Sequence, residues 1–139
     1  MREEIFSDIL SFFEGRSLEY ALYQLLEEKI LAQFPVERIR VQKTQISFWT
    51  RHPFAIVSLR RGSGWPKHCI TLTFGLDYQL DSPRIAQSVE PYPNRWTHHV
   101  PISSPEQIDG ELLGWLDESF QFTESKRRSS FPAININIL

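Results

Sequence analysis

The sequence is poor in cysteine, because Cys69 is the one cysteine among 139 residues. A single thiol excludes an internal disulfide and any zinc site built from several cysteines, and it favours a reducing, cytoplasmic location. We expect this thiol to be buried and structural. The chain also lacks an apolar run near the roughly 20 residues that a membrane-spanning helix needs, so we expect no membrane partner. Its first residues, Met1 to Glu4, are too acidic for a signal peptide, and we expect none.

Motifs of the common catalytic and metal-binding classes are also missing. No nucleophile elbow or HExxH spacing occurs, and Gly62-Ser63-Gly64 lacks the Lys-Ser/Thr of a phosphate loop. His98 and His99 are adjacent in a predicted strand, so their side chains point to opposite faces and are poorly placed to share one metal ion. We expect one of them in the core and the other exposed. We therefore assign no catalytic residue, no metal ligand and no cofactor; nothing argues for an enzyme, although catalysis stays open.

What the chain does have is the balance of a globular domain, with 41% hydrophobic and 23% charged residues. Its length fits one domain. The charge is segregated: residues 35–68 carry a net charge of +6, while residues 1–34, 69–104 and 105–139 carry −4, −1 and −3. A basic stretch between acidic ends bears on binding partners rather than on the fold.

Apolar spacing predicts helices at both ends of the chain. Residues 1–34 hold a short amphipathic helix and a longer one that begins at Ser17. The motif Ser-Pro-Glu-Gln at 104–107 is a typical helix start with a capping box. We predict a helix over residues 104–128, whose apolar stripe includes Trp115.

Between the helices, apolar and polar residues alternate with the period of two that is typical of strands. Five strands are predicted, at residues 38–43, 45–50, 54–60, 69–76 and 95–102. The connections are short except for residues 77–94, which favours antiparallel pairing. The predicted sheet spans residues 36–102, and the alternating tail 129–139 can add a further strand. We therefore predict one α+β domain over 1–139, a twisted antiparallel sheet of about five strands with two to three helices packed on one face.

Two segments carry a resemblance to known sequences, PYPNRWTHHV at residues 91–100 and IDGELLGWL at residues 108–116. The chain resembles a small bacterial domain family of unknown function that is sometimes labelled "predicted transport protein". The resemblance runs from about Phe13 to Phe122. It implies a small domain that occurs alone or appended to other modules, and it implies no site residue. The transport label fits poorly with a sequence that has no membrane-spanning run.

Alternation also sorts the strand residues onto two faces of the sheet. One face is apolar enough to pack against the helices, and His98 shares it. The opposite face gathers arginines, hydroxyl side chains, a tryptophan and a histidine. Arginine presents a planar fork of donors to phosphate or carboxylate, and tryptophan offers a stacking surface. The alternative is an ordinary solvated face, because antiparallel sheets often leave one side to water.

We therefore predict non-catalytic recognition of an anionic small molecule or partner through this basic face. The predicted ligand-binding residues are Arg38, Arg40, Trp49, Arg51, Arg84, Tyr92, Arg95 and His99. Two alternatives stay open: the face can bind single-stranded nucleic acid, or the C-terminal tail can mediate homodimerisation by adding to a sheet edge. Two observations disfavour nucleic acid: the face has one clear aromatic residue, and the pI of the sequence, about 6.1, is far from basic.

Overall fold

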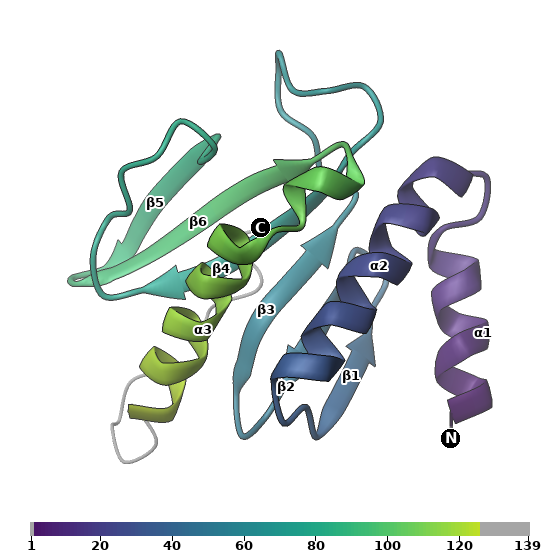
Figure 1. The fold of residues 1–139 in the computed structure, drawn as a ribbon, viewed down its shortest axis with the longest axis horizontal. Helices are drawn as coiled ribbons and strands as arrows, with labels where there is room; N and C mark the ends of the chain where they lie inside the picture. Colours follow the sequence, from purple (N-terminus) through teal and green to yellow (C-terminus); the bar gives the residue numbers. More distant parts are fainter. Residues whose placement is uncertain (1, 126–139) are drawn as a thin grey trace.

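A computed structural model of the chain describes residues 2–125. The helices and strands follow one another in the order α1 (Arg2–Phe12), α2 (Ser17–Gln33), β1 (Arg38–Val41), β2 (Gln45–Trp49), β3 (Pro53–Ser58), β4 (Ile70–Leu76), β5 (Gln87–Tyr92), β6 (Arg95–Ile102) and α3 (Gly110–Ser125) (Figure 1). The tail 129–139, predicted as an extra strand and a dimerisation element, lies outside the described residues.

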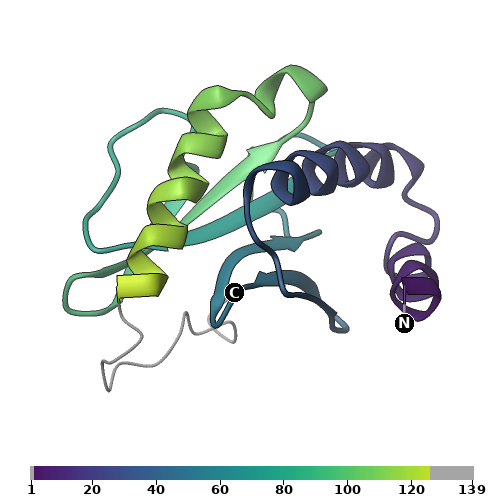
Figure 2. The ribbon, with the colours of Figure 1, turned by 60° about the horizontal axis from the view of Figure 1, so that its bottom comes forward.

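The strands form one antiparallel sheet in the order β1-β2-β3-β4-β6-β5. Figure 2 shows α2 and α3 together on one side of the sheet, and α1 lies beside β1. The predicted α+β class is confirmed. The sheet has one strand more than predicted, because β5 lies in the long connection, for which no strand is predicted. This strand contains Pro91 and has a register shift between Val89 and Tyr92, both of which are typical of a sheet edge.

The core lies between the sheet and the two long helices. The apolar stripe of α2 buries Leu26 and Ile30, and that of α3 buries Trp115. Phe74 of β4 stacks on the Trp115 ring at 6.0 Å between centroids. Cys69 is buried as predicted. Within residues 2–125, no helix has the length and apolar composition needed to cross a bilayer.

The structure moves the start of the last helix. Residues Pro105–Gln107 form a separate 3-10 turn, and α3 begins only at Gly110. Asp109 caps α3, because its Oδ1 accepts a hydrogen bond of 3.0 Å from a backbone N–H in the first turn. The predicted start at Ser104 was therefore wrong: the capping box is present, but it closes the short turn that precedes the helix.

Candidate functional site

The face of the sheet opposite α2 and α3 carries a row of mostly polar side chains, which we call the polar face. Its members are directly paired across all six strands, because the register places one residue of each strand in the same row. In strand order from β1 to β5 the row consists of Arg40, Ser47, Ile56, Thr73, His99 and Gln87. The polar composition inferred for this face is therefore present in the fold.

His99, near the middle of the polar face, is held by two side chains. Its Nδ1 lies 2.8 Å from Thr73 Oγ1, and its Nε2 lies 3.4 Å from Arg60 Nη1. Because a guanidinium only donates, Nε2 accepts and the ring proton lies on Nδ1, which donates to Thr73. Burial and the positive charge of Arg60 lower the pKa of His99 to about 4. The imidazole is therefore neutral near neutral pH.

Both adjacent histidines are buried, so the expectation that one of them is exposed was wrong. Their placement on opposite faces is confirmed, since the His98 ring stacks on Phe74 in the helix-covered core at 5.2 Å. His98 Nε2 accepts a hydrogen bond of 2.9 Å from the backbone N–H of Leu80. Alternation gives the direction of a side chain but not what lies over it, and here Arg60 reaches over His99 from beyond the end of β3.

The eight residues predicted to bind a ligand lie in three places. The first place is the corner formed by β1, β2 and the turn that follows, which we call the basic corner; it holds Arg38, Arg40, Trp49 and Arg51. The second is the opposite edge of the sheet, on β5 and β6, and holds Tyr92, Arg95 and His99. Tyr92 is exposed there, whereas Arg95 and His99 are 9% and 1% exposed. Arg84 lies apart from both groups, against α3.

The basic corner combines exposed guanidinium groups with an indole ring. Arg38 and Trp49 are cross-strand partners, and the Arg38 guanidinium lies 4.3 Å from the ring centroid, a cation–π contact. The indole Nε1 donates a hydrogen bond of 2.8 Å to Ser47 Oγ, which orients the ring. Arg38, Arg40 and Arg51 are exposed. Within residues 2–125 none of these three forms an ion pair, so their charges face solvent.

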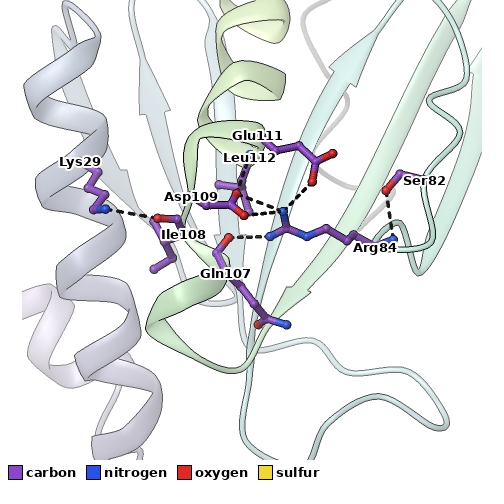
Figure 3. Close-up of polar contacts among 8 residues, drawn as sticks. All are labelled: Lys29, Ser82, Arg84, Gln107, Ile108, Asp109, Glu111 and Leu112. Atoms are coloured by element: carbon purple, nitrogen blue, oxygen red, sulfur yellow. Dashed lines mark hydrogen bonds and ion pairs between the residues drawn. The ribbon is translucent and has the colours of Figure 1, made fainter.

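Arg84 is instead held inside the fold, as Figure 3 shows. Its Nη1 lies 3.1 Å from both carboxylate oxygens of Asp109 and 2.9 Å from Glu111 Oε1. Its Nη2 donates to the backbone carbonyl of Gln107, and the guanidinium lies 5.4 Å from the ring centroid of Trp115. A backbone N–H of α3 and the Arg84 guanidinium lower the pKa of Asp109. These contacts, which we call the Arg84 clamp, attach the long loop before β5 to the start of α3.

Arg60 is the residue of the polar face that sequence reasoning missed. The strand predicted at residues 54–60 is apolar on both sides, so its residues could not be assigned to a face of the sheet from composition. The available signal was the alternation of Ile56, Ser58 and Arg60, which places all three on one side. The structure shows the Arg60 Nη2 donating to Gln87 Oε1 at 2.7 Å while Nη1 contacts His99. In the part of the chain that the structure describes, no three His, Cys, Asp or Glu side chains are placed to hold a metal ion.

These elements define a small α+β domain, a six-stranded antiparallel sheet with two helices on one side and a polar face on the other. The chain belongs to the family described as "Domain of unknown function (DUF5655)", whose model matches residues 10–123. The expected membership of an uncharacterised domain family is thus confirmed, and the match says nothing of transport. Comparisons with curated proteins and with solved structures give no match.

Proposed function

We propose that this domain recognises an anionic ligand that carries a planar group, and that the basic corner binds it. The observation that carries the proposal is the set of three exposed guanidinium groups, Arg38, Arg40 and Arg51, that have no carboxylate partner among residues 2–125. Like charges held close together repel one another, and an opposite charge relieves that repulsion. An anion therefore completes the electrostatics of this surface.

In this proposal, the arginines of the corner contact the anionic groups of the ligand, and Trp49 contacts its planar group. Arg38 and Arg40 are two residues apart on one strand, so they point to the same side about 7 Å apart and can contact two anionic groups of one ligand. The Trp49 indole, already covered on one side by Arg38, extends a flat surface on which a planar group can stack.

Binding without catalysis is the function that these side chains support. Arginine stays protonated across the physiological range, so it cannot act as a general base. Trp49 and the Ser47 hydroxyl that accepts its hydrogen bond offer no base either. A cytoplasmic location is part of the proposal, because the buried Cys69 thiol is free, as is usual in a reducing compartment.

Single-stranded nucleic acid is the second candidate ligand, because arginines beside an aromatic ring on a sheet are also how such strands are bound. Affinity that depends on many phosphate contacts falls by orders of magnitude between about 50 mM and about 200 mM salt. A nucleotide with few contacts loses much less. Titrations of the full chain with ATP and with oligothymidine at both salt concentrations separate the two candidates.

The planar group is tested by comparing ATP with inorganic tripolyphosphate. We expect saturable binding of both, tighter for ATP, and we expect Trp49→Ala to weaken ATP binding by about tenfold while leaving tripolyphosphate binding unchanged. Equal loss for the two ligands would remove stacking from the proposal. No saturable binding of either anion would remove the proposal itself.

A further inference from the structure

We propose a second anion site in this domain, a cavity that takes the phosphate group of a small phosphorylated molecule. The cavity has a volume of about 570 Å³ and lies between the start of α2 and the connection from β3 to β4. Its wall includes four basic side chains, Arg16, Arg61, Lys67 and His68. The first comes from the α2 side and the other three come from the β3–β4 connection, so the fold brings together charges from two distant parts of the sequence.

This cavity is separate from the basic corner. β3 begins at Pro53, next to the corner, and ends at Ser58, next to the connection that lines the cavity. A six-residue strand spans about 20 Å, and Trp49 of the corner pairs with Pro53 at the end of β3 far from the cavity. Figure 1 shows the β3–β4 connection and the start of α2 at the same end of the molecule. The inference therefore does not rest on the function proposed for the corner.

The charge around the cavity is positive. Arg16, Arg61 and Lys67 are exposed, and none of them forms an ion pair within residues 2–125. Glu19 is the carboxylate in the wall; its side chain is 3% exposed, and its Oε2 lies 3.1 Å from Nδ1 of His68. Three permanent cations against one carboxylate leave a local excess of two positive charges even when His68 is neutral.

Two of the basic groups are already oriented by the protein. The Arg61 Nη1 donates a hydrogen bond to the backbone carbonyl of Lys67 at 2.5 Å, which holds the guanidinium at the cavity and leaves its other N–H groups to donate elsewhere. Because Nδ1 of His68 bonds to Glu19, Nε2 is the ring nitrogen left for a ligand. Donors fixed before binding lose less conformational entropy when the anion arrives.

The size and lining of the cavity indicate what accompanies the phosphate. Pockets for small ligands measure about 300–1,000 Å³, so this cavity has room for a whole molecule. Most of its wall is polar, and its aliphatic side chains are Leu18 and Leu59. A phosphorylated polar molecule of the sugar phosphate type fits this lining better than an apolar one.

Titration of the full chain with glucose 6-phosphate, followed by amide chemical shifts at constant ionic strength, tests the site. We expect saturable shifts at Ser17 and at His68, and none with unphosphorylated glucose. Arg61→Gln and Lys67→Gln should each weaken binding by about tenfold, because each removes a charge-assisted contact.

Lys43→Gln is the matched control, since it removes an exposed cation that belongs neither to this cavity nor to the basic corner and should leave this affinity unchanged. The inference is overturned if glucose 6-phosphate gives no saturable shifts, if Arg61→Gln and Lys67→Gln bind as the wild type does, or if Lys43→Gln loses as much affinity as they do. Inorganic phosphate, titrated in the same way, should also bind and should show the same loss in both cavity variants. A response to it that both variants leave intact would equally contradict the site.

Discussion

The Arg84 clamp and the basic corner differ in what surrounds their guanidinium groups. Arg84 has two carboxylates, a backbone carbonyl and an indole ring around it, all from one segment of the chain near the start of α3. The exposed arginines of the corner have the Trp49 ring beside one of them and no carboxylate partner among residues 2–125. The comparison teaches that an arginine whose acceptors the fold supplies stabilises the fold, whereas an arginine without them can serve a ligand.

The largest effect expected on the clamp side is that of Trp115→Ala. Trp115 is 6% exposed and lies between Phe74 and the Arg84 guanidinium, so its removal leaves a cavity in the core. We expect a loss of about 3–5 kcal/mol in the free energy of unfolding, measured by chemical denaturation. Trp49→Ala is the matched control, because the same side chain is removed from the corner, and it should cost about 1 kcal/mol. Equal losses would erase the distinction between the two regions.

The buried middle of the polar face predicts a dependence of stability on pH. The pKa of His99 in the folded chain is about 4, below its ordinary value of 6.5. Between these two pH values, His99 is therefore protonated in the unfolded chain and neutral in the folded chain. The contribution of His99 to the free energy of unfolding is complete above about pH 6.5. It is lost as the pH falls toward about 4, by roughly 3 kcal/mol in all. His98 acts in the same direction, since burial lowers its pKa too.

Free energies of unfolding measured across this pH range check the assignment. His99→Gln keeps a donor for Thr73 and should flatten the dependence on pH. An unchanged slope in that variant would show that His99 is not the group responsible.

A smaller loss is expected when the clamp itself is opened. Arg84→Met removes the hydrogen bonds to Asp109, Glu111 and a backbone carbonyl while keeping an unbranched apolar side chain over Trp115. We expect a loss of about 1–2 kcal/mol in the free energy of unfolding, reduced from the value for buried pairs because both carboxylates are partly exposed. Arg51→Met, at the corner, should stay within about 0.5 kcal/mol of the wild type. The comparison fails if the corner variant is the more damaging one.

Much of the fold could be predicted because it depends on local periodicity. Each of the five predicted strands begins and ends within two residues of an observed strand. They could be predicted because the alternation of apolar and polar residues over a half-buried sheet is present in the sequence itself. β5 was missed because an edge strand with a proline and a register shift has the composition of a loop. The start of α3 was misplaced because two capping signals, at Ser104 and Asp109, follow each other, and only packing decides which one begins the helix.

The candidate site could be predicted only in part, because face assignment says nothing of long-range partners. The pairing of Arg38 with Trp49 follows from a short hairpin and was within reach of the sequence. The partners of Arg84 are more than 20 residues away in the chain, and no local pattern shows that a loop arginine meets them. The contact between Arg60 and His99 likewise depends on long-range structure, because the order of strands β3, β4 and β6 brings the two residues together.

The most direct test of the central claim is the affinity of the Arg40→Gln/Arg51→Gln double variant for ATP, measured by isothermal titration calorimetry at fixed salt. Neither arginine has a carboxylate partner within residues 2–125, so we expect stability within about 0.5 kcal/mol of the wild type and an affinity at least about tenfold weaker. Arg61→Gln, which alters the separate cavity, is the control. It should leave the affinity of the basic corner for ATP unchanged. An ATP affinity that the double variant retains, or that Arg61→Gln alone abolishes, would contradict the account.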